Sequence, residues 1–334
     1  MQFWGLAASV SVSFGMALVF AFLLHWFDRF EKEPFLLLCG VFLWGAIVSA
    51  GSAFLVNTVL GLGVFLITGS ETASNLASSV LIAPVLEEIL KGFAVLLVFF
   101  LFRGQFDSLM DGILYAGIAA LGFAATENAY YIFTYGFIEN GWQGFWSLAA
   151  IRTLLVGWQH PFYTAFFGIG LAISRLNRNT LVKLTAPLAG LFLAMAAHAI
   201  HNLLSDLLPG IGPLPLSSVI DWMGWLAMLG FIFIVMRLEK RDIVKYLFDE
   251  VGQGTLTEAQ YQTTISARQT NLKRFSALFT GRCAMVNKFY RTASRLAIKK
   301  KQLAKLGEER NNSEVVAALR DETRRLSADL AETA

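Results

Sequence analysis

The sequence predicts an all-α polytopic membrane protein with about seven transmembrane helices and a cytoplasmic helical C-terminal tail. Of its 334 residues, 56% are hydrophobic and only 15% are charged, and the mean hydropathy is +0.57. An average soluble domain has about 25% charged residues, so an ordinary soluble protein is excluded. Residues 1–238 hold 9 basic against 12 acidic residues, whereas residues 239–334 hold 18 against 12. We therefore predict a transmembrane domain over 1–238 and a soluble, basic, helical tail over 239–334.

Seven apolar stretches are long enough to cross the about 30 Å hydrocarbon core as helices. The first has no basic n-region and no small-residue cleavage site, so we expect it to stay in place as a span. A further apolar run, Leu60 to Thr68, is too short to span alone and is predicted to be re-entrant or interfacial. Cys39 and Cys283 form no disulfide framework and no cysteine-based zinc motif. The seven stretches are 3–27, 35–58, 80–102, 110–138, 146–174, 184–206 and 216–236.

The orientation of these spans follows from the basic residues between them. The links at 28–34, 103–109 and 175–183 contain Lys or Arg, whereas those near 59–79, 139–145 and 207–215 contain none. Because basic links stay on the cytoplasmic side, the first set is predicted to be cytoplasmic. Seven spans then lead from an outside N-terminus to a cytoplasmic tail.

The tail carries a dense basic segment. Thr257 is a predicted helix N-cap, and between Gln260 and Gly307 there are eleven basic residues and no acidic one. One interpretation is a solvated helical hairpin. The other is an amphipathic stretch held against anionic cytoplasmic lipid. Nucleic-acid binding is not expected.

Ionisable residues recur at similar depth in four of the predicted spans. Glu87 and Glu88 lie about seven residues into the third span, and Glu127 lies in the fourth. His160 is near the middle of the fifth span, and His198 lies in the sixth. A carboxylate at such depth costs several kcal/mol unless it is paired or hydrated, and such residues usually mark function. The predicted topology puts all four positions in the outer half of the bilayer.

These side chains suit the hydrolysis of a peptide bond. Glu87 and Glu88 stand four and three residues before Lys91, so either can reach its ammonium. A desolvated carboxylate can act as a general base, and histidine with carboxylate ligands can hold zinc beside an open water position. Asn202, one turn after His198, is a candidate to orient the water or the oxyanion.

The same residues leave other interpretations open. A proton- or ion-coupled transporter would use the buried carboxylates as a relay, and a non-catalytic scaffold would use them to fix helix register. Glu127 taken alone also suits a satisfied packing residue. Arg152 is a candidate anchor, carboxylate partner or catalytic group, and His201 is a candidate polar neighbour near the interface.

Four motifs on four successive predicted spans resemble the PrsW family of intramembrane proteases, which is related to the CAAX-processing proteases. The "DRFEKEP" link and the "LTEAQY" opening of the tail are similar to family features as well. The resemblance covers nearly the whole chain. The motifs are Glu87-Glu88-x-x-Lys91, then Phe123-x-x-x-Glu127-Asn128, then His160 before "PFYTAFFG", then His198-x-x-x-Asn202.

The resemblance implies an intramembrane peptidase with a glutamate-activated water, either bound to zinc or free of metal. It assigns the general base to Glu87 and Glu88, and it implies that Glu127, His160 and His198 complete the catalytic centre or bind a metal. The CAAX enzymes have a histidine at the position of Glu127, and a metal-free glutamate mechanism is an alternative among these relatives.

The resemblance also implies a setting and a partner. It suggests a bacterial-type cytoplasmic membrane and a membrane-anchored substrate, such as an anti-sigma factor, cut on its extracytoplasmic side. The predicted outer-half position of the ionisable residues fits such a substrate.

Overall fold

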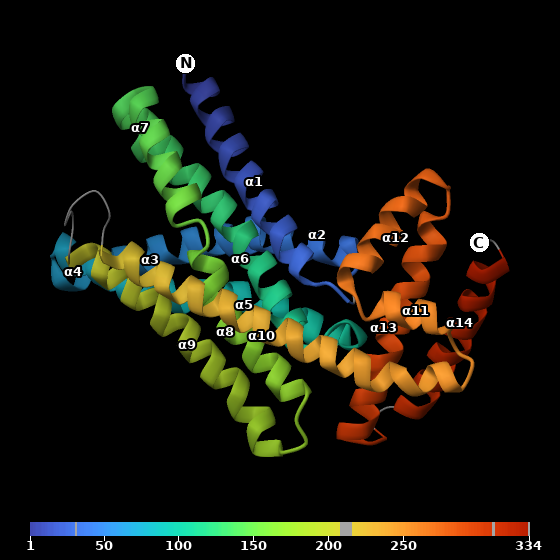
Figure 1. The fold of residues 1–334 in the computed structure, drawn as a ribbon. Helices are drawn as coiled ribbons and strands as arrows, with labels where there is room; N and C mark the ends of the chain where they lie inside the picture. The colour runs from blue at the N-terminus through green and yellow to red at the C-terminus, as the bar shows by residue number, and fades with distance from the viewer. Residues whose placement is uncertain (31, 208–215, 309–310, 333–334) are drawn as a thin grey trace. The chain divides into compact units, whose positions relative to one another are not determined.

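The computed structural model describes residues 1–30, 32–207, 216–308 and 311–332, and every regular element in these ranges is helical (Figure 1). The prediction of an all-α protein is confirmed. The chain forms two compact units. The first contains Met1–Trp26 and Glu33–Phe231, and the second contains Phe27–Lys32 and Ile232–Ala334.

The described residues of the first unit form nine α-helices and the beginning of a tenth. Among them, three π-helical turns, at Trp44–Ser49, Ser78–Ile82 and Ile132–Ile138, join successive helices without a loop. A fourth, at Ala150–Leu155, is separated from the next helix by a turn at 156–158. The helices are α1 (Gln2–Phe27), α2 (Phe35–Leu43), α3 (Ala50–Thr68), α4 (Glu71–Ala77), α5 (Ala83–Leu101), α6 (Leu109–Tyr131), α7 (Glu139–Ala149), α8 (Gln159–Arg175), α9 (Thr180–Leu207) and α10 (Leu216–Gly252).

Five helical stretches of the described chain are long and apolar enough to cross a membrane. The predicted span 80–102 corresponds to α5, which is not one of the five and which contains three ionisable residues among its 19. The predicted link 207–215 falls almost entirely outside the described residues. The five stretches are Gln2–Phe27, Phe35–Thr68, Leu109–Arg175, Thr180–Leu207 and Ser217–Gly252.

The third of these stretches is a hairpin and not one helix. Its 67 residues would measure about 100 Å as a straight helix, about three times the hydrocarbon thickness. The chain reverses at Gly141, whose φ of 61° and ψ of −152° are open almost only to glycine. The predicted spans 110–138 and 146–174 are therefore the two arms, and α7 packs back on the turn Ile132–Ile138. Phe137 and Trp142 make an edge-to-face contact across the reversal, with ring centroids 4.9 Å apart.

The run Leu60 to Thr68, which was predicted to be re-entrant or interfacial, is not a separate element. The helix that begins at Phe35 continues to Thr68, and it ends only at Gly69 in the left-handed conformation. Gly61 remains helical because it packs closely against α4, where the Ser74 hydroxyl donates to the Gly61 carbonyl at 2.7 Å. The 35–58 span thus extends ten residues further than expected.

Helix α6 lies at the centre of the first unit. Its side chains from Met110 to Ala125 are buried, and it packs against α2, α5 and α8. Glycines permit this close approach, because a Cβ on Gly112 would lie 2.3 Å from the Gly168 carbonyl oxygen. A Cβ on Gly122 would lie 2.0 Å from the carbonyl oxygen of Phe42. Small residues at helix contacts are the usual means of packing helices in a membrane.

The second unit is a helical domain with its own apolar core. It contains the end of α10, α11 (Glu258–Thr264), α12 (Ala267–Phe279), α13 (Cys283–Leu306) and α14 (Asn312–Glu332). The core includes Ile243, Tyr261, Phe289 and Leu326. The predicted N-cap at Thr257 is confirmed, since its hydroxyl accepts the Gln260 N–H and the Gln260 side chain accepts the Thr257 N–H.

The close packing of α6 on α8 predicts that a glycine-to-alanine change at the contact lowers the free energy of unfolding, although alanine usually stabilises a helix. Gly168→Ala should destabilise the protein by about 1–3 kcal/mol, because the new methyl group meets the Gly112 carbonyl oxygen at 2.0 Å. Gly63→Ala in α3 is the matched control, since a Cβ there meets no atom within 4 Å. Alanine normally favours a helix by about 1 kcal/mol over glycine, so this control should be neutral or stabilising. Unfolding in detergent measures both, and a stabilised Gly168→Ala variant would contradict the packing.

Candidate functional site

The site is built on α5, which carries a buried ion pair. Lys91 Nζ lies 2.6 Å from Glu88 Oε1 and 3.9 Å from Glu87 Oε2. The side chains of Lys91 and Glu88 are both fully buried. Spacings of three and four residues bring these groups to one face of the helix, as the sequence predicted.

Glu88 joins three helices. Its Oε1 also contacts His198 Nδ1 of α9 at 3.0 Å, and its Oε2 accepts the Thr164 hydroxyl of α8 at 2.8 Å. Both oxygens of this carboxylate therefore have partners. Because Nδ1 of His198 faces a carboxylate, we assign the imidazole proton to Nδ1, which leaves a lone pair on Nε2.

Glu87 is the carboxylate with a free oxygen. Glu87 Oε2 is buried and has no hydrogen-bond partner among the described residues, while Oε1 lies 3.5 Å from Asn57 Nδ2. The nearest imidazole atom is His198 Nε2, 3.9 Å from Oε2. Two hydrogen-bond acceptors thus face each other with no donor between them. A buried pair of this kind needs a cation or a proton donor between its atoms.

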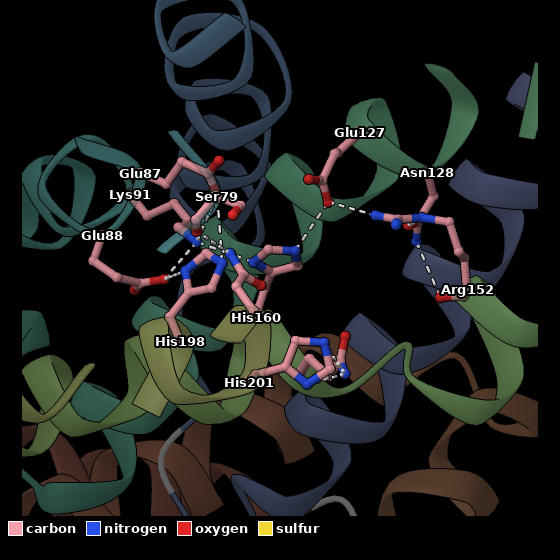
Figure 2. A network of polar contacts seen from close by, with 12 residues as sticks. Ser79, Glu87, Glu88, Lys91, Glu127, Asn128, Arg152, His160, His198 and His201 are labelled. Carbon is pink, nitrogen blue, oxygen red and sulfur yellow. Dashed lines mark hydrogen bonds and ion pairs between the residues drawn. The ribbon is translucent and has the colours of Figure 1, made fainter. Parts of the chain in front are cut away.

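His160 connects this group to a second set of charges (Figure 2). Its Nδ1 accepts from Lys91 Nζ at 3.1 Å, and its Nε2 lies 3.0 Å from Glu127 Oε2. Arg152 holds the same oxygen of Glu127 at 2.8 Å, and its Nε donates to Asn128 Oδ1 at 2.8 Å. Figure 2 shows His160 between the α5 carboxylates on one side and the Glu127–Arg152 pair on the other. Arg152 is therefore a carboxylate partner, one of the roles that its sequence position left open.

A metal-binding group lies within this network. One ligand atom from each of Glu87, His160 and His198 comes within 4.8 Å of the others. The sequence analysis had instead grouped Glu127 with the two histidines. Glu127 contacts His160 and Arg152, whereas Glu87 offers the unpartnered oxygen. The donors fit zinc, which takes imidazole nitrogen and carboxylate oxygen in proteins.

Asn202 lies beside the site and fastens α9 to the turn before α5. Its Nδ2 donates to the Ser79 carbonyl oxygen at 2.7 Å. That carbonyl needs an external donor, because the Ala83 N–H reaches back five residues to Ser78 and the next donor in this register would be Pro84. Proline has no N–H. The π-helical turn and Pro84 leave the Ser79 carbonyl oxygen without a backbone donor, and the Asn202 side chain supplies one.

A second polar cluster lies behind His198. Asp221 of α10 receives hydrogen bonds from Gln159 at 2.5 Å and from the Tyr163 hydroxyl at 3.0 Å, and it lies 2.6 Å from His201 Nδ1. Tyr163 stacks on the His198 ring with centroids 5.1 Å apart. This cluster includes His201. Its Tyr163 ring packs on the face of the His198 ring, whereas Glu88 and Glu87 approach the nitrogen atoms at the edge of that ring.

Sequence reasoning missed Asp221, Asn57 and Ser79. Asp221 carried a usable signal, since it is an acidic residue inside the predicted span 216–236. Asn57 also lies inside a predicted span. Ser79 gave no usable signal, because serine is common in apolar helices and its backbone oxygen is the atom that Asn202 contacts.

Comparisons with known proteins follow this geometry. Residues 33–237 match the family model described as "PrsW family intramembrane metalloprotease". The chain is 31% identical over 161 residues to "Protease PrsW" of Geobacillus kaustophilus (strain HTA426), which covers 48% of this chain and 63% of that protein. It is 35% identical over 108 residues to "Protease PrsW" of Clostridioides difficile (strain 630), covering 32% and 43%. The chain thus spans less than two thirds of either relative. No solved structure matches.

The two possible metal groups can be separated by measurement. Glu87→Gln should lower the zinc content of the purified protein, because it removes the unpartnered ligand oxygen. Glu127→Gln should retain zinc, since Glu127 is not among the three residues whose ligand atoms converge. Glu71 is exposed, so Glu71→Gln is the control for replacing a carboxylate by an amide. Metal analysis by mass spectrometry reads all three, and loss of zinc in Glu127→Gln but not in Glu87→Gln would favour the sequence-derived set.

The bond between Asn202 and Ser79 predicts a non-additive pair of substitutions. Asn202→Ala should cost about 1–3 kcal/mol, because the Ser79 carbonyl oxygen loses its only external donor. In a Pro84→Ala background the restored backbone N–H can reach Ser79, so the same change should cost less than half as much. Unfolding of the four variants in detergent measures the coupling. Equal costs in both backgrounds would show that Pro84 does not orphan this carbonyl.

Proposed function

The chain belongs to the PrsW family of intramembrane metalloproteases, and we propose that it hydrolyses a peptide bond of a membrane-anchored protein. The observation that carries this proposal is the unpartnered Glu87 oxygen facing His198 Nε2 inside a buried cluster. Most buried polar groups have their hydrogen bonds completed, so a buried carboxylate oxygen without a partner beside an imidazole nitrogen is a candidate for catalysis or metal binding.

The protein is a multi-pass membrane protein, and we propose seven spans in it. The five apolar stretches give six crossings once the hairpin at Gly141 is counted as two, and α5 supplies the seventh. The ion pair and hydrogen bonds of Glu88 and Lys91 support α5 as a span, since they satisfy two of its three charged side chains. The N-terminus then lies outside, the tail is cytoplasmic, and the site opens toward the outer face of a bacterial-type cytoplasmic membrane.

Glu88 and Lys91 are positioning residues in this mechanism. The Glu88 carboxylate holds the proton of His198 on Nδ1 and so directs the Nε2 lone pair toward Glu87. Lys91 neutralises Glu88 and also donates to His160 Nδ1, which places the His160 proton on Nε2, toward Glu127. The ion pair thereby sets both imidazole tautomers at once.

Glu87, His160 and His198 would hold a zinc ion. His160 joins the set when Lys91 gives up its hydrogen bond to Nδ1. When bound, zinc supplies Lewis-acid activation of water and of the scissile carbonyl. Without a metal, Glu87 Oε2 is the atom that can take a proton from water, because both oxygens of Glu88 already have hydrogen-bond partners.

Glu127 and Asn202 hold neighbouring groups of the site in place. Glu127, held by Arg152, keeps the His160 ring in place and can receive its Nε2 proton. Asn202 keeps α9 against the turn before α5, so its amide acts on the geometry of His198 through the helix. To orient the water or the oxyanion, Asn202 would have to use its side-chain carbonyl oxygen or change its side-chain conformation.

The substrate we propose is a membrane-anchored protein cut on its extracytoplasmic side. The outer-half depth of the ionisable groups in the proposed topology supports this choice. Within that class, an anti-sigma factor is the substrate that the family resemblance suggests.

Two matched variants test the reaction. Glu87→Gln and Glu88→Gln should each stay folded and lose at least about 10²-fold in cleavage, because one removes the reacting oxygen and the other removes the group that orients His198. Glu71→Gln on exposed α4 should cleave normally. Host membranes expressing each form are compared by mass spectrometry of new protein termini. Full cleavage by both variants would refute the assignment.

The same preparations separate proteolysis from transport. Reconstituted in vesicles with an internal pH dye, the wild type should produce no Glu88-dependent proton flux. Flux that disappears in Glu88→Gln, without any change in protein termini, would instead support an ion-coupled transporter.

A further inference from the structure

Helix α12 of the second unit exposes large apolar side chains. Leu272, Phe275, Leu278 and Phe279 are 58%, 60%, 58% and 78% exposed, within a helix of only 13 residues. Phe275 and Phe279 pack on each other with ring centroids 5.2 Å apart. A contiguous apolar patch of this kind on a water-facing domain marks an interaction surface.

The patch follows one face of α12. Leu272, Phe275 and Phe279 are three and four residues apart and therefore form one ridge. The buried residues of the helix, Thr270 and Ala277, lie on the opposite side and pack it onto the unit. The ridge thus points away from the core that stabilises the domain, and no described residue covers it.

Exposed cations lie on and beside α12. Arg268, Lys273 and Arg282 are exposed and form no ion pair with any carboxylate that the structure describes. Several other basic residues of the unit do contact an acidic group. Such pairs are Lys288–Glu322, Lys300–Glu250 and Lys301–Asp242, at 2.8, 2.6 and 2.5 Å.

The second unit also holds the link that directly follows α1. Phe30, three residues after the end of α1, is buried in the same core as Tyr261 and Phe289. Burial lowers the pKa of the Lys32 ammonium to about 8, Asp28 opposes this shift, and Arg274 of α12 adds to it. Arg274 therefore lies within Coulomb range of a link that begins at the end of a membrane-spanning helix.

We propose that the α12 ridge, consisting of Leu272, Phe275 and Phe279 with Arg268, Lys273 and Arg282, docks onto the anionic phospholipid surface of the membrane that the chain spans. A lipid surface offers phosphates beside hydrocarbon, which matches cations beside exposed Leu and Phe. A second copy of α12 would bring like charges together. Nucleic acid would leave the aliphatic part of the ridge without a partner. This proposal does not depend on the proposed proteolysis.

A spin label near the ridge tests the docking in the full chain. Cys39→Ser and Cys283→Ser remove the native thiols, and Ser276→Cys places a nitroxide on exposed α12. Ala328→Cys on exposed α14 is the control position. The protein is placed in nanodiscs of phosphatidylcholine alone or mixed with phosphatidylglycerol. Collision rates with oxygen, which concentrates in lipid, and with an aqueous nickel chelate report the depth of each label.

The label on α12 should become accessible to oxygen and protected from nickel in the anionic nanodiscs, and added salt should reverse this. The label on α14 should stay water-accessible throughout. Arg268→Glu with Lys273→Glu should weaken docking by about fivefold or more for each charge removed. Arg324→Glu with Arg325→Glu on exposed α14 makes the same charge change and should leave docking intact.

Three results would overturn the proposal. One is a label on α12 that is equally water-accessible in both kinds of nanodisc. Another is protection that is equal with and without anionic lipid, which would make the cations irrelevant. The last is protection that grows with protein concentration in detergent, which would assign the ridge to a second protein chain.

Discussion

The buried ion pair between Lys91 and Glu88 is the interaction on which the rest of the site depends. Both side chains are fully buried, and removing one partner of such a pair typically costs about 3–5 kcal/mol because the other charge stays behind. Lys91 also donates to His160, and Glu88 also holds His198 and Thr164. One pair of charges on a single helix turn therefore joins α5, α8 and α9. Its geometry leaves Glu87, the neighbouring carboxylate, with an oxygen that nothing satisfies.

The packing around α6 makes this arrangement possible. Glycine contacts bring α8 against α6 at backbone distance, and α8 carries His160 and Thr164 into reach of α5. The hairpin at Gly141 returns the chain so that Arg152 meets Glu127 from the other arm. Without water to solvate them, each of these polar groups needs a partner within the protein. The polar contacts consequently specify which helix faces meet, while the glycines determine how closely they approach.

The two units differ in how their charged side chains are arranged. In the first, most buried charges are paired within or between helices, and Glu87 keeps one buried oxygen without a hydrogen-bond partner. In the second, acidic side chains of α10 and α14 neutralise part of the basic surface, as Glu250 does for Lys300 and Arg320. The cations of α12 are left over beside an apolar ridge.

Local sequence determined the helical class, the polar residues at depth and the Thr257 cap, because hydropathy, spacing and side-chain type act within a few turns. It also determined that Glu87, Glu88 and Lys91 share a helix face. Only the tertiary structure decided that Glu87, and not Glu127, converges with the two histidines, since this depends on which faces of α5, α6 and α8 meet. The continuation of the helix to Thr68 and the role of Asp221 were also decided there. Contacts between distant helices are set by packing and by backbone oxygens such as that of Ser79, and neither leaves a periodic trace in the sequence.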